Sequence, residues 1–258
     1  MTVVGLLASF SSGAAGPSLL FGAQYANWNG TRIVFSTTSN GSGATSFNGL
    51  DGSFDSNTNR LYDGFAGGGT PQFRTGGYLG WATANAFPSV ASADGRSSTI
   101  GYHGGVAYLY VGNVDRTIDI YTLSTLAFVA TWTVSNFVNQ IGGLAYDGAG
   151  GLYAIDIGTA TTLYRINTLQ PITQTIAATT VCTLGRAVQF GLLFNGTTVI
   201  ARSTPGTTVT EFNISTGAIV NTYTAEGTSG YGISIDYGNK LLYTGGFSDT
   251  TMRRFPGT

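Results

Sequence analysis

One stretch of this sequence aligns without a gap on a second stretch further along the chain. It reads Tyr121-Thr-Leu-Ser-Thr-Leu-Ala-Phe-Val-Ala-Thr-Trp132 in the first copy and Phe212-Asn-Ile-Ser-Thr-Gly-Ala-Ile-Val-Asn-Thr-Tyr223 in the second, 91 residues further along. A related stretch, Tyr164-Arg-Ile-Asn-Thr-Leu-Gln-Pro-Ile-Thr-Gln-Thr175, falls between them. Short apolar runs bounded by Ser, Thr and Asn are typical of β-strands joined by turns. The chain is therefore built from repeated β units. We count these units before considering any functional motif.

A second element precedes these stretches and recurs six times. An aromatic or apolar residue is followed by an Asx-type turn and a short β-run, and Asn or Asp before Gly supplies the positive φ angles of a tight hairpin. One apolar residue after each turn serves as its anchor, and the intervals between successive anchors are 29, 46, 45, 46 and 44 residues. The six turns are Trp28-Asn29-Gly30, Phe54-Asp55-Ser56, Tyr102-His103-Gly104, Tyr146-Asp147-Gly148, Phe194-Asn195-Gly196 and Ile235-Asp236-Tyr237-Gly238, with anchors at Ile33, Tyr62, Tyr108, Tyr153, Val199 and Tyr243.

A period near 45 residues with about four strands per unit predicts an all-β protein, a single β-propeller over residues 1–258. Six blades are expected, and five blades with an irregular N-terminal insert are the alternative. The first interval is short, so the first blade is expected to lack its outer strand. The predicted blades cover about 18–49, 50–83, 98–135, 140–178, 186–226 and 230–258 with 2–10.

The two ends of the chain suggest how such a ring is closed. The last unit stops one strand short of a full blade, and Thr2–Phe10 is an apolar stretch without a blade of its own. Pairing Thr2–Phe10 as the outermost strand of the last blade would remove an open edge. This strand assignment replaces a signal-peptide interpretation, since the stretch carries no Lys or Arg.

The composition excludes several classes of function. Charged residues make up only 9% of the chain, with one lysine, and the formal net charge is -1. That charge gives no basic surface for nucleic acid or for an anionic membrane. No apolar run reaches the ~18 residues of a membrane helix, so membrane insertion is not expected. A surface rich in Thr, Ser, Asn and Gly is common on exported or particle-bound proteins.

The stretch from Tyr146 to Asp156, Tyr-Asp-Gly-Ala-Gly-Gly-Leu-Tyr-Ala-Ile-Asp, is followed by Leu163-Tyr-Arg-Ile-Asn-Thr168. It resembles the repeat of NHL, YncE-like and gluconolactonase-like propellers, in which an Asp-Gly turn leads into a strand of the type Leu-Tyr-Val-Ala-Asp. The likeness covers residues 98–258 well and the first hundred weakly. It implies the fold but no single function, because such propellers include enzymes, lectins and scaffolds.

No catalytic, cofactor or metal site emerges from the residues. The gluconolactonase-like enzymes hold a metal with a Glu, Asn and Asp set, but the only glutamates here are Glu211 and Glu226, and the expected N-terminal glutamate is missing. Asp147, Asp156 and His103 occupy turn or strand-end positions and are interpreted as hairpin residues. One His and one Cys in unrelated contexts give no triad, Cys-His pair or zinc site, and no Asp-x-Asp-x-Asp cluster specifies Ca²⁺.

The sequence therefore favours a non-enzymatic structural or interaction protein, a subunit of a viral (phage) or extracellular particle such as a tail, fibre or decoration protein. Its expected partners are copies of itself or other particle proteins. The alternative is a lectin that binds a cell-surface glycan, because aromatic side chains stack on sugars. A lactonase-like hydrolase is the third hypothesis. The candidate glycan or partner contacts are Trp81, Trp132 and Trp28, although Trp81 and Trp132 also fit packing between blades.

Overall fold

Five β-sheets, here called blades 1 to 5, make up the protein in the computed structural model. Blade 1 contains β2 (Gly49–Asp55), β3 (Arg60–Phe65), β4 (Gln72–Thr75) and β5 (Asn85–Ala86). Blade 2 contains β6 (Gly95–His103), β7 (Val106–Asn113), β8 (Thr117–Thr122), β9 (Phe128–Val134) and, at its edge, β13 (Gln174–Ile176). Blade 3 contains β10 (Ile141–Tyr146), β11 (Gly151–Asp156), β12 (Thr162–Asn167) and β14 (Thr179–Thr183). Blade 4 contains β15 (Val188–Asn195), β16 (Thr198–Ser203), β17 (Thr208–Asn213) and β18 (Ile219–Thr224). Blade 5 contains β19 (Gly232–Asp236), β20 (Leu241–Gly246), β21 (Asp249–Pro256) and β1 (Gly41–Ala44).

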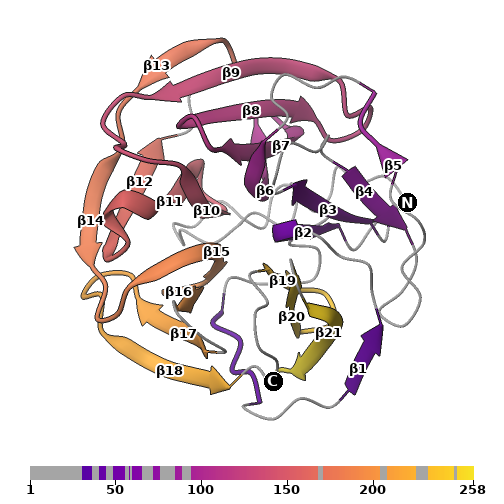
Figure 1. Cartoon of the computed structure of the whole chain (residues 1–258), viewed down its shortest axis with the longest axis vertical. Helices are drawn as coiled ribbons and strands as arrows, with labels where there is room; N and C mark the ends of the chain where they lie inside the picture. Colours follow the sequence, from indigo (N-terminus) through magenta and orange to yellow (C-terminus); the bar gives the residue numbers. More distant parts are fainter. Residues whose placement is uncertain are drawn as a thin grey trace, which may run out of the picture.

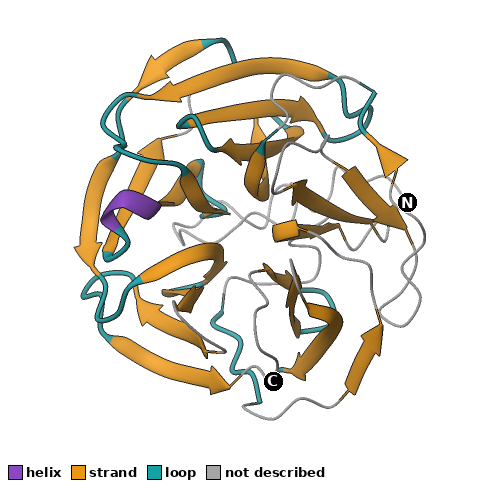
Figure 2. Ribbon diagram, in the orientation of Figure 1, coloured by secondary structure: helices purple, strands orange, loops and turns teal. Residues whose placement is uncertain are grey.

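These blades surround a common centre, as Figures 1 and 2 show. The first strand of each blade lies innermost, and the innermost strands contact one another in the order β2, β6, β10, β15, β19 and back to β2. The structure describes residues 31–36, 41–44, 49–55, 58, 60–65, 72–75, 85–88, 94–167, 171–203, 208–224, 232–246 and 249–258. Within these ranges the one helix is the 3₁₀ turn η4 (Ile157–Thr159), and no helix is long and apolar enough to cross a membrane.

The protein is therefore an all-β, five-bladed propeller, and the prediction of six blades is wrong. The alternative of five blades with an irregular N-terminal insert is correct. The short first unit forms no blade of its own among the described residues. Its described part consists of residues 31–36, where Phe35 bridges to Gly257, and of β1, which pairs antiparallel with β21 as the outer strand of blade 5. The place beside β21 that was predicted for Thr2–Phe10 is held by β1. Thr2–Phe10 itself lies outside the described residues.

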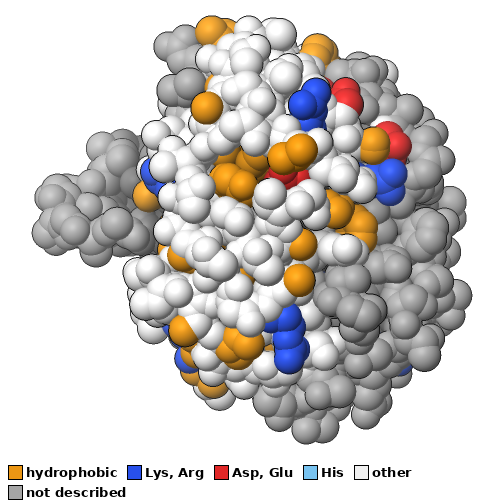
Figure 3. Space-filling view, turned by 60° about the vertical axis from the view of Figure 1, so that its left-hand side comes forward, with side chains coloured by type: hydrophobic (Ala, Val, Ile, Leu, Met, Phe, Trp, Pro, Cys, Tyr) orange, Lys and Arg blue, Asp and Glu red, His pale blue; other side chains and the backbone are white. Residues whose placement is uncertain are grey.

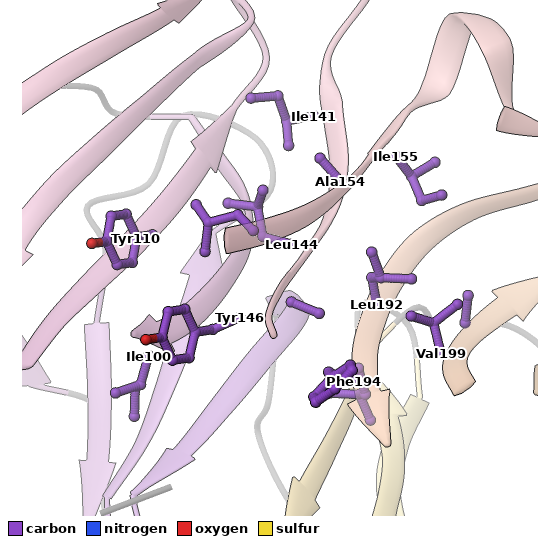
Figure 4. Close-up of a cluster of buried hydrophobic side chains, with 14 of the residues drawn as sticks. Ile100, Tyr110, Ile141, Leu144, Tyr146, Ala154, Ile155, Leu192, Phe194 and Val199 are labelled. Carbon is purple, nitrogen blue, oxygen red and sulfur yellow. The ribbon is translucent and has the colours of Figure 1, made fainter. Parts of the chain in front are cut away.

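The aromatic residues before the turns pack between blades. Phe54 contacts Tyr243 across blades 1 and 5, with ring centroids 6.4 Å apart, and Tyr102 meets Tyr146 edge-on across blades 2 and 3 at 6.0 Å. Phe194 of blade 4 stacks on Tyr153 of blade 3 at 5.9 Å. Figure 4 shows the buried side chains that continue this packing from blade 2 through blade 3 to blade 4, among them Ile100, Tyr110, Leu144, Tyr146, Ala154, Leu192 and Val199.

At the centre of the ring, two innermost strands approach so closely that a side chain does not fit between them. A Cβ atom placed on Gly142 of β10 would lie 1.8 Å from the carbonyl oxygen of Gln189 in β15, far inside any allowed contact. Glycine is therefore required at this position by backbone packing.

Candidate functional site

The predicted hairpin residues hold turns, as the sequence indicated. Asp147 Oδ1 accepts hydrogen bonds from the backbone N–H groups of Ala149 (2.8 Å) and Gly151 (2.7 Å), and its Oδ2 accepts one from Arg165 (2.7 Å). Asp156 is fully buried, and its carboxylate accepts from the backbone N–H groups of Val138, Asn139 and Gly158 at 2.8 to 3.1 Å. Both carboxylates thus accept hydrogen bonds from backbone N–H groups of the turns, and Asp147 also pairs with Arg165.

His103 lies beside a tight two-residue turn at the end of β6. It pairs with Val106 across Gly104 and Gly105, whose φ angles of 58° and 80° fit a type I′ hairpin. The His103 side chain is half-buried. The turn assignment made from the sequence is confirmed.

A shallow, open pocket of about 440 Å³ lies where this turn meets the corresponding turn of blade 3. Two tyrosines form its aromatic part, and the Tyr146 hydroxyl donates to the backbone oxygen of Tyr102 at 3.3 Å. Burial, together with the charge of Asp147, raises the pKa of Tyr146 to about 12, so this phenol stays protonated at neutral pH. The pocket can offer backbone groups, an imidazole and aromatic edges to a neutral polar ligand. It is lined by Tyr102, His103, Gly104, Gly105, Tyr146, Gly148, Ala149 and Gly150.

Glu211, discussed above as a possible metal ligand, is instead enclosed by hydrogen-bond donors. It lies within β17, is fully buried, and forms a bidentate pair with Arg32 at 2.7 and 2.6 Å. Thr198 (2.5 Å), Tyr223 (2.8 Å) and Asn195 (3.2 Å) also donate to its carboxylate. Burial alone would raise the pKa of Glu211, but the hydrogen bonds from Arg32, Thr198 and Tyr223, together with the Arg32 charge, lower it below 4.5. The carboxylate is thus ionised and has its lone pairs occupied.

The same cluster attaches residues 31–36 to blade 4. The backbone N–H and C=O of Ile33 bond the side chain of Asn195, both at 2.8 Å, and the Phe35 ring meets Tyr223 edge-on at 6.4 Å. The gapless repeat places Ile120 opposite Glu211, and the third copy places Leu163 there. A carboxylate at a position that is apolar in blades 2 and 3 was the sequence signal for this cluster, which the sequence analysis missed.

Among the tryptophans named from the sequence, Trp132 is described by the structure. It is fully buried in β9, and its ring packs against Tyr110 with centroids 5.5 Å apart. Trp132 therefore packs inside the propeller and is not exposed to a glycan. Trp28 and Trp81 lie outside the described residues. Nowhere in the described ranges do three or more His, Cys, Asp or Glu side chains gather in a way that could hold a metal ion.

Exposed apolar side chains recur at equivalent repeat positions along the outside of the ring. Phe128 and Val129 begin β9 and are 40% and 37% exposed, while Ile219 and Val220, their partners in the gapless alignment, begin β18 and are both 44% exposed. In the third copy, Ile172 aligns with Val129 and is 56% exposed. These five residues are called the rim residues below. Figure 3, which brings the left-hand side of Figure 1 forward, shows separate hydrophobic side chains on a surface with few charged ones.

Comparison with known proteins supports the fold and no more than the fold. Neither a protein-family profile nor a curated protein sequence matches this chain. Among solved structures, the chain is similar to glutaminyl cyclase from Myxococcus xanthus, with 14% identity and a TM-score of 0.61, covering 88% of this chain and 97% of the other. A second similar structure is the β-propeller domain of Cps50 (Swd1) from Myceliophteria thermophila, with 13% identity and a TM-score of 0.42, covering 78% and 68%. The chain thus belongs to the structural class of β-propellers.

Proposed function

We propose that this protein is a non-enzymatic interaction module, a subunit of a viral or extracellular particle such as a tail, fibre or decoration component. The observation that carries the proposal is the set of rim residues: equivalent positions of successive repeats expose apolar side chains on a surface with little charge. Phe128 with Val129, and Ile219 with Val220, are two pairs of adjacent exposed apolar residues, and exposed apolar surface favours association. A chain with 23 charged residues in 258 opposes such association only weakly.

The buried carboxylates support the same proposal. Asp147, Asp156 and Glu211 each have their oxygens engaged by hydrogen-bond donors, and none of them has a second carboxylate or a histidine at hydrogen-bond distance among the described residues. Convergent titratable groups are what acid–base or nucleophilic catalysis requires. The side chains that sequence reasoning considered for hydrolysis have structural partners.

A lectin is the second candidate, and one observation favours it. The pocket between the turns of blades 2 and 3 combines two tyrosines, the only histidine and exposed backbone groups, which suits an uncharged ligand such as a sugar ring. A lectin of this kind would bind one defined glycan as an isolated monomer.

The two candidates are separated by measuring association and glycan binding on the same sample. Sedimentation velocity and negative-stain electron microscopy of the purified protein should show concentration-dependent assemblies, and a glycan array should show no selective binding. Substitution of His103 by Ala, which changes a half-buried turn residue in the pocket, should leave the assemblies unchanged. A protein that stays monomeric, forms no particle and binds one glycan in a way that His103→Ala weakens would replace this proposal by the lectin.

A further inference from the structure

The edge of blade 2 already carries an added strand. β13 comes from the connection between β12 and β14 of blade 3, leaves its own blade, and pairs parallel with β9 of blade 2. Gln174, Thr175 and Ile176 lie opposite Trp132, Thr133 and Val134 in this pairing. The outer edge of a blade in this protein therefore binds a short, uncharged β-segment.

The corresponding edge of blade 4 has no such strand among the described residues. β18 is the last strand of its sheet, and its sequence, Ile-Val-Asn-Thr-Tyr-Thr, has no charge and no proline. Natural edge strands commonly carry Lys or Pro, which oppose pairing with another chain, and β18 has neither. It has a bulge at Val220, as β9 has at Val129, and β9 still pairs with β13 beyond its bulge. β18 also exposes two large apolar side chains, Ile219 and Val220.

Two equivalent backbone N–H groups show the same difference between blades 2 and 4. In blade 2 the N–H of Thr131 donates to the hydroxyl of Thr173, just before β13. Its repeat equivalent in blade 4 is Thr222, whose N–H donates to the side chain of the adjacent Asn221 at 2.9 Å. The N–H group of Thr131 thus bonds a separate segment of the chain, whereas the N–H group of Thr222 bonds the side chain of the preceding residue.

We infer that the β18 edge is the surface through which two copies of this chain pair, strand to strand. This inference rests on the proposed function and specifies its contact. A two-fold axis makes identical edge strands antiparallel and brings the same patch of each copy together. Two neutral strands meet without charge repulsion, and Ile219 and Val220 of both copies lose exposure to water. The neighbouring edge β14 has no large exposed apolar side chain, so it lacks this contribution.

The test uses the full chain and one matched pair of substitutions. Val220→Lys puts a charge on β18, and Val129→Lys puts the same charge at the equivalent position of β9, a strand whose edge pairs with β13 over residues 132–134. By sedimentation equilibrium, Val220→Lys should weaken dimerisation at least ~30-fold, since the charge enters twice per dimer, whereas Val129→Lys should change it less than ~3-fold. Circular dichroism melts establish that both variants fold.

A cross-link provides an independent readout. Thr222→Cys should give a disulfide-linked dimer under mild oxidation, and Thr131→Cys should not, because β18 faces its copy and β9 faces β13. A wild-type dimer that Val220→Lys leaves intact overturns the edge inference while the assembly function stands. A wild-type protein that is monomeric up to about 1 mM also overturns it, and the particle and glycan measurements above then decide the proposed function separately.

Discussion

Replacing Glu211 by Gln tests whether the buried cluster holds residues 31–36 on blade 4. The substitution keeps the shape of the side chain and removes its charge. All described partners of this carboxylate act as donors, from Arg32, Thr198, Tyr223 and Asn195. Gln brings an NH₂ group where an acceptor stood, so donors face a donor and Arg32 loses its counter-charge.

The expected cost follows from burial on the two sides of the pair. Breaking a buried ion pair on one side costs ~3–5 kcal/mol. The Glu211 side chain is fully buried but that of Arg32 is 27% exposed, so water relieves part of the loss. We expect a decrease in the free energy of unfolding of about 3 kcal/mol, and a fall in Tm of about 6 to 12 °C for a chain of this size.

Urea unfolding followed by tryptophan fluorescence measures this loss, with Asp94→Asn as the control. Asp94 and Arg96 also form an ion pair, at 3.1 Å, but their side chains are 33% and 20% exposed. Exposed pairs contribute ~0–1 kcal/mol, so the control should stay within that range. A loss below about 1 kcal/mol for Glu211→Gln would refute the role of the cluster.

The pH dependence gives a second check with a defined sign. Because the pKa of Glu211 is lower in the folded protein than the usual 4.5, its stabilisation is fully present above that usual value. The stabilisation is lost as the pH falls through the lower pKa of the folded state. The difference in stability between the wild type and Glu211→Gln should therefore be constant near neutral pH and shrink in acid, and a difference that grows in acid contradicts the assignment.

Three further predictions concern other parts of the ring. Gly142→Ala should destabilise the protein by about 3 kcal/mol or more in urea unfolding, because the new Cβ meets the Gln189 oxygen, whereas Gly104→Ala, where a Cβ meets nothing within 4 Å, should cost only the strain of its positive φ. Asp156→Ala should lower stability by about 1–3 kcal/mol, since three part-buried backbone N–H groups lose their acceptor, and a neutral result would show that water replaces it. EDTA should leave the thermal melt unchanged and lactone or phosphoester hydrolysis should be undetectable; metal-dependent turnover abolished by one Asp or Glu substitution would overturn this expectation.

Most of the blade architecture could be predicted from the sequence, because local residue patterns determine the strands and the turns between them. The duplicated stretch from Tyr121 to Trp132 spans β8 and β9, and its copy from Phe212 to Tyr223 spans β17 and β18, as the repeat required. The period near 45 residues identified the propeller. Hairpin turns at Asp147 and His103 followed from the residue types that tolerate tight turns.

The prediction of six blades was wrong because one turn-like unit forms no blade and instead attaches to blade 4. Ile33 looked like the anchor of a first blade, but it bonds Asn195 across 162 residues of sequence. Such contacts between distant segments leave no periodic signal. Likewise β13 looks like the beginning of an outer strand, and only the packing of two blades shows that it joins its neighbour.

The attachment of residues 31–36 also has a consequence for how the chain is made. Arg32 is synthesised 179 residues before its partner Glu211. At ~5–20 residues per second, Arg32 waits roughly 10 to 40 s before that carboxylate exists. Throughout this interval the hydrophobic Ile33 and Phe35 have no blade to enter. The segment of the described chain that is synthesised first is thus among the last to reach its native place, and a nascent chain must be protected from aggregation until then.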